Sequence, residues 1–256
     1  MKKFIKNRDW KKICVLIEKS ENQKWLVFLM HWLWWSKDEK FIRTLSKVFQ
    51  NNNFTVVSFD TRNTFWESEW SYENATVTNC LEDLEDVIFW SENQDFYEEK
   101  LYLAGHSLGW ICTTLFTQKY PEKVKALSPA STVVSWKLSL ETFSEDEIKN
   151  WKEKWYREKI SKSVSWRIKK NSWWEIVDRC KYDLKEKAKT MNLPILFIVW
   201  DKDETTPLKH LKLLIEKITC NYDLEIIKGA EHSFTKENEL SEIYKIYDKW
   251  IKNINN

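Results

Sequence analysis

A five-residue motif in the middle of the chain has the residue types and spacing of a hydrolytic nucleophile. Gly105-His106-Ser107-Leu108-Gly109 has the pattern Gly-x-Ser-x-Gly and follows the apolar segment Lys100–Ala104. After a strand, this pattern is typical of a nucleophile elbow, a sharp strand-to-helix turn in which glycines leave room around an exposed serine. We therefore predict that Ser107 is a nucleophile.

Two further residues complete a catalytic triad. A serine hydroxyl is a weak nucleophile on its own, and it needs a general base and an acidic group that orients the base. His232, in the phrase Gly229-Ala230-Glu231-His232, and Asp203 each follow a candidate strand. The order Ser, Asp, His is the order found in hydrolases that use such an elbow. We predict that His232 is the base and that Asp203 is the acid.

The other three histidines fit the role of base less well. His106 lies inside the elbow, with its side chain expected to point away from Ser107. His210 lies on a candidate helix and is expected at the surface. His31 ends a strand, and we expect it to fix the following loop through hydrogen bonds. These considerations leave His232 as the candidate.

Three neighbouring residues could serve as the acid, and two backbone amides are the candidates for the oxyanion hole. Asp201 and Glu204 compete with Asp203 within one turn, and we prefer Asp203 while keeping Asp201 as the alternative. Acyl transfer also needs backbone amides aimed at the developing oxyanion. We predict that these amides belong to Leu108, directly after the nucleophile, and to Leu33, in the loop after the strand that ends at His31.

Glycine and tryptophan have unusual frequencies in this chain. Only 3 of the 256 residues are glycine, far below the usual ~7%, whereas tryptophan occurs 17 times. Several tryptophans stand where turns ordinarily need glycine, as in His31–Ser36, in Phe65–Trp70 and at Trp200. Lysine greatly outnumbers arginine, which agrees with an AT-rich genome. These features indicate that many tryptophans replace glycines.

We hypothesise that most of the tryptophan codons are UGA, read as glycine in the source organism. The positions interpreted as glycine are Trp10, Trp25, Trp32, Trp34, Trp35, Trp66, Trp70, Trp110, Trp136, Trp155, Trp166, Trp173, Trp174 and Trp200. Trp90, Trp151 and Trp250 lie in helical patterns that a glycine would weaken, so we interpret them as genuine. The alternative is a naturally tryptophan-rich surface or ligand groove, but such a surface would not select turn positions.

The order of elements predicts a mainly parallel sheet covered by helices, because short apolar runs alternate with longer helical patterns. The candidate strands are Lys12–Ile17, Trp25–Met30, Phe54–Asp60, Lys100–His106, Val124–Ser128, Pro194–Trp200 and Leu224–Lys228. The candidate helices are Lys37–Gln50, Val77–Trp90, Leu108–Lys119, Leu208–Ile218 and Glu237–Ile251.

One highly charged stretch, residues 135–188, interrupts this alternation. It has helical patterns over residues 144–159 and 175–189. We predict a single domain over residues 1–256 with a helical cap inserted at 135–188, above the carboxyl ends of the strands where open α/β sheets bind ligands. The alternative is an ordinary pair of surface helices.

Composition limits the classes of partner. The net charge of +2 gives no electrostatic reason to expect nucleic acid binding, and no apolar run has the length of a signal or a membrane span. We expect a soluble cytoplasmic protein that acts on a small molecule, and the sequence does not indicate an oligomeric state. The five cysteines are scattered and form no Cys-x-x-Cys pair, so neither a disulfide framework nor a zinc site is expected.

Taken together, the motifs resemble the α/β-hydrolase superfamily over essentially the whole chain. Within it they are similar to bacterial cinnamoyl and feruloyl esterases and related carboxylesterases, on the segments His31–Glu39, Phe65–Trp70, Asn74–Val77, Gly105–Gly109 and Gly229–Phe234. The resemblance implies a cofactor-free serine esterase with a cap, and it assigns the catalytic roles to Ser107, Asp203 and His232 and the oxyanion hole to Leu33 and Leu108. The chain departs from the pattern by its tryptophans at glycine positions and by one extra residue in the segment 60–66.

The resemblance therefore predicts hydrolysis of small carboxylic esters through an acyl-enzyme. A monoacylglycerol lipase or lysophospholipase is the alternative within the same chemistry. A serine peptidase is less favoured, because we find no propeller-like domain that would select peptides. A catalytically inactive ligand-binding protein of the same fold is the alternative from a different class.

Overall fold

A computed structural model describes residues 1–31, 36–64, 67–69, 75–131, 133–160, 168–229 and 236–255. Within these residues, one sheet has eight strands in the order β1-β2-β4-β3-β5-β6-β9-β10. The strands are β1 (Lys2–Lys6), β2 (Lys12–Glu18), β3 (Trp25–Met30), β4 (Phe54–Asp60), β5 (Leu101–His106), β6 (Val124–Ala130), β9 (Ile195–Trp200) and β10 (Tyr222–Ile227). β2 pairs antiparallel with β1 and β4, and all other neighbours are parallel.

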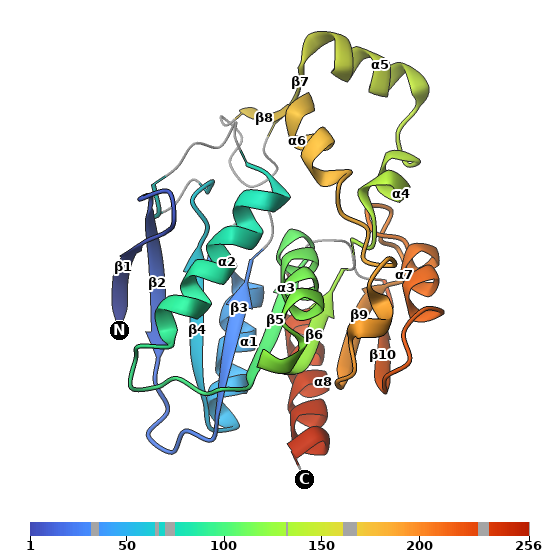
Figure 1. Cartoon of the computed structure of the whole chain (residues 1–256). Helices are drawn as coiled ribbons and strands as arrows, with labels where there is room; N and C mark the ends of the chain where they lie inside the picture. The colour runs from blue at the N-terminus through green and yellow to red at the C-terminus, as the bar shows by residue number, and fades with distance from the viewer. Residues whose placement is uncertain are drawn as a thin grey trace.

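Helices cover both faces of this sheet (Figure 1). They are α1 (Lys40–Asn51), α2 (Val77–Ser91), α3 (Leu108–Lys119), α7 (Leu208–Ile215) and α8 (Glu237–Asn255). Helices α1 and α8 share one hydrophobic cluster with the sheet, and α2, α3 and α7 share the other. The predicted class, a mainly parallel sheet flanked by helices, is confirmed. None of the described helices combines the length and the low polarity needed to cross a bilayer.

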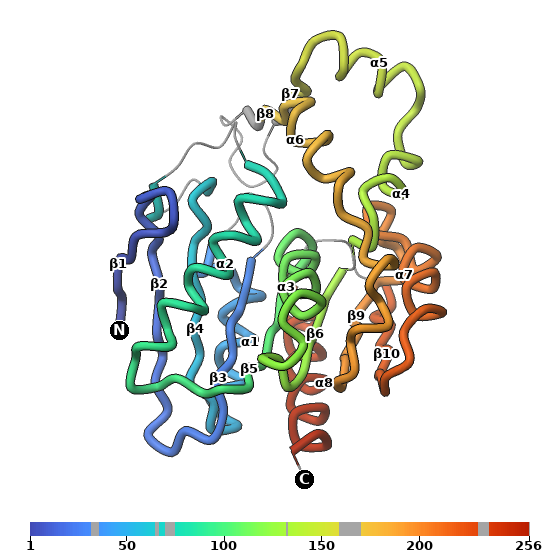
Figure 2. Tube along the Cα trace, in the orientation of Figure 1, coloured from blue at the N-terminus to red at the C-terminus, as the bar shows by residue number. Residues whose placement is uncertain are grey.

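The stretch 135–188, which we call the cap segment, connects β6 to β9 at the end of the sheet where the parallel strands finish (Figures 1 and 2). Its elements are α4 (Trp136–Leu140), α5 (Glu145–Lys154), β7 (Tyr156–Ile160), β8 (Ile168–Ser172) and α6 (Trp173–Arg179). The base of α6 is fixed to α2, because Asp178 accepts hydrogen bonds from the backbone N–H of Thr78 at 3.0 Å and from its hydroxyl at 2.5 Å.

The helices predicted over residues 144–159 and 175–189 are present, but both end earlier than the sequence pattern predicts. Helix α5 ends at Lys154 because Trp155 has left-handed backbone, with φ of 60°, and the chain then pairs antiparallel as β7 with β8. Helix α6 ends at Arg179, and only a short 3₁₀ turn, Ala188–Thr190, lies in the remainder of the predicted helix. Strand β1, at the edge of the sheet, was also missed.

Eight of the fourteen reinterpreted tryptophans lie among the described residues, in three kinds of environment. Trp10 and Trp155 have φ of 60°, a region that favours glycine. Trp110 and Trp200 are fully buried, and the indole N–H of Trp110 has no hydrogen-bond acceptor among the described residues. Trp25, Trp136, Trp173 and Trp174 lie at the starts of β3, α4 and α6, and Trp32, Trp34, Trp35, Trp66, Trp70 and Trp166 lie outside the described residues.

Replacing Trp155 by glycine is expected to raise the free energy of unfolding by about 1 kcal/mol, because it removes a side chain from left-handed backbone. The indole is 64% exposed, so little buried area is lost. Trp151, interpreted as genuine, is the matched control: it is buried, and its indole N–H donates to the carbonyl of Asn171 at 2.9 Å. Trp151→Gly should cost about 3–5 kcal/mol. Equal destabilisation of both variants in urea unfolding would contradict the glycine interpretation of position 155.

Candidate active site

Ser107 lies at the junction of β5 and α3, the strand–turn–helix context that its motif requires. Its backbone has φ of 53° and ψ of −107°, which is strained for a residue other than glycine. The N–H of Ser107 donates to the carbonyl of Ala130 on β6 at 3.0 Å, and its carbonyl accepts from the N–H groups of Trp110 and Ile111. The backbone of Ser107 is therefore fixed to the neighbouring strand and to the first turn of α3.

The two glycines of the motif are required by close backbone approach. A Cβ atom on Gly105 would lie 2.6 Å from the carbonyl of Gly109. A Cβ atom on Gly109 would lie 2.3 Å from the carbonyl oxygen of Met30 and 2.6 Å from that of His31. The first turn of α3 therefore packs directly against the end of β3, where the predicted oxyanion loop begins.

Gly109→Ala is expected to separate these two backbones, because no flexible side chain can yield to the new methyl group. The free energy of unfolding should fall by about 1–3 kcal/mol or more, with a loss of hydrolytic activity. Gly229→Ala is the matched control. Gly229 has φ of +72°, but no atom of the described residues lies within 4 Å of the added Cβ, so backbone strain of about 1 kcal/mol is expected. Similar thermal unfolding of both variants would contradict the packing argument.

Asp203 lies in the loop after β9 as a buried carboxylate with an ordered set of donors. One oxygen accepts from the N–H groups of Thr205 and Thr206, each at 2.9 Å. The other accepts from the hydroxyl of Thr206 at 2.6 Å and from that of Ser131 at 3.1 Å. A buried carboxylate needs such bonds to remain ionised. Asp203 therefore has the environment expected of an oriented acid.

The two competing acidic residues have different surroundings. Asp201 is exposed, and its carboxylate accepts from the N–H of Gly229 at 2.8 Å. It therefore holds the turn that leads toward residue 232 rather than lying buried as Asp203 does. Glu204 is also exposed. Burial thus distinguishes three carboxylates that the sequence could only rank by position.

Two of the predicted site residues, His232 and Leu33, lie outside the described residues, so their roles stay predictions. Leu108 is described: it is the first residue of α3, and a backbone N–H in the first turn of a helix has no intrahelical acceptor. The N–H of Leu108 is therefore suited to donate to an oxyanion beside Ser107. Ser107 and Leu108 follow β5 and Asp203 follows β9, two parallel strands on either side of β6 in the sheet, and the catalytic roles of all five residues stay predictions.

The remaining histidines are all buried. His31 accepts a hydrogen bond at Nε2 from the N–H of Thr61 at 3.4 Å, as the expected structural role requires. The His106 ring packs near Phe41, with ring centres 5.0 Å apart. The expectation that His210 lies at the surface was wrong: it is buried on α7, and burial lowers its pKa. The charges that act on its pKa include Lys209 of the same helix and Glu141 and Lys185 of the cap segment.

Sequence reasoning missed a buried ion pair beside the predicted oxyanion loop. Asp60, the last residue of β4, accepts from the N–H of Lys37 at 2.9 Å and from its Nζ at 3.0 Å. Nζ also donates to Glu67 at 2.6 Å. Although burial alone would lower the pKa of Lys37, these carboxylates raise it above its usual value. Lys37 and His31 are thus bonded to two consecutive residues, Asp60 and Thr61.

Asp60 and Glu67, the partners of Lys37, also belong to the one group of potential metal ligands among the described residues. A sulfur of Cys14 and oxygens of Asp60 and Glu67 lie within 4.8 Å of one another. The ammonium group of Lys37 already contacts both carboxylates. Burial raises the pKa of Cys14 to about 11, so the thiol is protonated at neutral pH and is a poor ligand. The donor set fits a lysine ammonium better than a metal ion.

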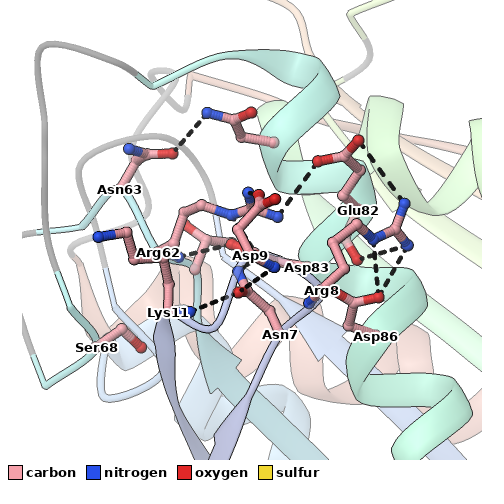
Figure 3. A network of polar contacts seen from close by, with 12 residues as sticks. Asn7, Arg8, Asp9, Lys11, Arg62, Asn63, Ser68, Glu82, Asp83 and Asp86 are labelled. Carbon is pink, nitrogen blue, oxygen red and sulfur yellow. Dashed lines mark hydrogen bonds and ion pairs between the residues drawn. The ribbon is translucent and has the colours of Figure 1, made fainter.

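A second polar network supports the loop after β4 (Figure 3). Arg62 donates from its backbone N–H and from Nε to buried Asp83 of α2, at 2.6 Å and 2.7 Å. Asn7, at the turn between β1 and β2, donates to the same carboxylate at 2.8 Å. Asp9 from this turn also pairs with Arg62. The network joins the turn between β1 and β2, the loop after β4 and helix α2.

The chain was compared with known families and proteins. The model of the prolyl oligopeptidase family, Peptidase_S9, matches residues 41–256. None of the curated proteins compared with the chain matches it.

Solved structures of hydrolases match the fold over almost the whole chain. Est1E from Butyrivibrio proteoclasticus, solved with ferulic acid bound, is 17% identical, with a TM-score of 0.82 and 98% of each chain covered. Alpha/beta hydrolase domain-containing protein 10 from mouse is 16% identical, with a TM-score of 0.81 and 99% of each chain covered. The esterase domain of a Rhodothermus marinus protein is 14% identical, with a TM-score of 0.71, and covers 99% of this chain and 98% of that chain. The predicted α/β-hydrolase fold is confirmed.

Proposed function

Because this chain belongs to the prolyl oligopeptidase family and is a serine hydrolase of the α/β fold, we propose that it cleaves small carboxylic esters with a triad of Ser107, His232 and Asp203. One observation carries the proposal. The strained elbow of Ser107 is bonded to Ala130, and the next residue, Ser131, is bonded to buried Asp203. These contacts support the proposal, because they connect the residue proposed as nucleophile and the residue proposed as acid through two consecutive residues at the carboxyl end of β6.

In the proposed reaction, His232 takes the proton of the Ser107 hydroxyl as Oγ attacks the ester carbonyl carbon. The amides of Leu108 and Leu33 donate hydrogen bonds to the oxyanion that forms. His232 then protonates the departing alcohol, which leaves an acyl group on Ser107. Water, deprotonated by His232, hydrolyses this acyl-enzyme and releases the acid. Asp203 orients the imidazole and stabilises its charged form.

Two observations bear on the class of substrate. Est1E, a structure with ferulic acid bound, shares this fold over 98% of the chain, which supports a carboxylic ester. The family match to prolyl oligopeptidases favours a peptidase as the second candidate. The cap segment lies above the strand ends in Figure 1, so we infer that its residues select between these substrates.

The test combines covalent labelling with three substrates. A fluorophosphonate should label the folded chain, with the added mass on the peptide that contains Ser107. We expect p-nitrophenyl acetate to be cleaved faster than p-nitrophenyl laurate, and a proline p-nitroanilide to be cleaved poorly.

Each contrary result points to a named alternative. Preference for the laurate would indicate the lipase-like function, and preference for the anilide would indicate a peptidase. If the folded protein is not labelled at all, the ligand-binding alternative is favoured instead.

A further inference from the structure

Ser131 connects the two described members of the proposed triad. It directly follows β6 and is fully buried. Its N–H donates to the carbonyl of Ile198 on β9 at 3.0 Å, and the preceding residue, Ala130, accepts from the N–H of Ser107 at 3.0 Å. Two consecutive residues thus tie the nucleophile elbow to the strand that leads to Asp203.

The side chain of Ser131 acts on Asp203 together with Thr206. Both hydroxyl groups donate to the same carboxylate oxygen, Oδ2, from Ser131 at 3.1 Å and from Thr206 at 2.6 Å. The opposite oxygen is held by the amides of Thr205 and Thr206. A carboxylate with donors on both oxygens cannot rotate without breaking hydrogen bonds. The two hydroxyls therefore fix the plane of the acid.

The backbone of Ser131 is strained, with φ of 56°. Glycine would adopt this conformation more easily, but glycine has no hydroxyl group. A strained residue that is neither exposed nor glycine persists where the surrounding structure requires its side chain, and such residues concentrate at functional sites. The backbone bond of Ser131 to Ile198 and its hydroxyl bond to Asp203 together hold it in this conformation.

We propose that Ser131 and Thr206 are positioning residues for the catalytic acid. Their hydroxyl groups hold Asp203 in the orientation in which its carboxylate accepts the imidazole N–H of His232. They act through Asp203 and do not touch the substrate. This inference rests on the proposed function, in which Asp203 is the acid of the triad.

The test measures kcat and KM for p-nitrophenyl acetate in the full-length chain, using whichever of its tryptophan and glycine forms is more active. Thr206→Val removes the hydroxyl at nearly constant volume, and Thr206→Ser retains it as the matched control. Ser131→Ala and Ser131→Gly both remove the other hydroxyl, and the glycine variant also relieves the backbone strain, so it guards against failure to fold. Ser107→Ala and Asp203→Asn report on the triad itself.

Misorientation of the acid should lower kcat by about 10-fold in each variant that lacks one hydroxyl, with KM unchanged. The double variant Ser131→Gly/Thr206→Val should lower kcat by about 100-fold. Thr206→Ser should retain activity, and Ser131→Gly should lose it while unfolding at the same or a higher temperature. Loss of kcat with full thermal stability is not expected from a purely structural role.

Two results overturn the inference in distinguishable ways. If Ser107→Ala and Asp203→Asn are inactive while Ser131→Gly and Thr206→Val keep kcat, the triad stands and the positioning role is wrong. A rise in KM at constant kcat has the same meaning. If Asp203→Asn or Ser107→Ala remains active, the proposed triad fails, and the positioning role fails with it.

Discussion

Replacing Ser107 by alanine is expected to lower kcat for ester hydrolysis by about 10⁴- to 10⁶-fold, because no other group can form the acyl-enzyme. The substrate should still bind, since the hydroxyl contributes little to binding before attack. The fold should persist, because the contacts of Ser107 that hold the elbow are made by its backbone N–H and carbonyl.

The matched control for this variant is Ser20→Ala. The backbone N–H of Ser20 bonds to Thr55 at the start of β4, at the end of the sheet opposite the elbow. The Ser20→Ala substitution should leave kcat and fluorophosphonate labelling unchanged. Labelling of the Ser107→Ala chain at its former rate would show that another serine reacts, and residual hydrolysis at the original rate would remove Ser107 from the mechanism.

The central strands and the elbow were predictable because their signals are local. Strands Trp25–Met30 and Phe54–Asp60 and helix Leu108–Lys119 begin and end where the sequence predicts. The two strands lie inside the sheet and are largely apolar, Trp25–Met30 without interruption and Phe54–Asp60 apart from Thr55, Ser58 and the final Asp60. The glycines at 105 and 109 mark a backbone approach that admits no Cβ atom. Each of these features is encoded within a few residues.

The cap segment and the supports of the site were not predictable in this way. Strands Tyr156–Ile160 and Ile168–Ser172 are rich in lysine and polar residues, and each becomes a strand only by pairing with the other. The charges of Lys37 and Asp60 look like surface charges until the fold buries them together, 23 residues apart in the chain. The left-handed backbone of Ser131 has no signal in its residue type. Such features depend on tertiary contacts.

The largest gain in activity is expected from restoring glycine at all fourteen reinterpreted positions. Three of them, Trp32, Trp34 and Trp35, flank Leu33 in the predicted oxyanion loop. We expect an indole at these positions to displace the amide of Leu33, and loss of one oxyanion donor costs on the order of 10²- to 10³-fold in kcat. The glycine form should therefore hydrolyse p-nitrophenyl acetate at least about 100-fold faster than the tryptophan form.

Two partial restorations separate the effect on the site from the effect on the fold. A chain with glycine only at positions 32, 34 and 35 should recover most of the activity. A chain with glycine only at positions 10 and 155, where φ is 60° in the structure, should gain about 2 kcal/mol of stability but little activity. Peptide mass spectrometry of the protein from its own host is the independent check.

The two buried positions, Trp110 and Trp200, determine whether the glycine form is as stable as the tryptophan form. Trp110 and Trp200 fill space in the two core clusters, so glycine there leaves cavities unless neighbouring side chains repack. If the codons are read as glycine, the native core closes over these positions, and the glycine form unfolds at a temperature no lower than the tryptophan form. Tryptophan found at position 32 or 200 in host protein, or a tryptophan form that is folded and fully active, would refute the recoding hypothesis. The triad could still stand in that case, because the Ser107→Ala experiment tests it separately.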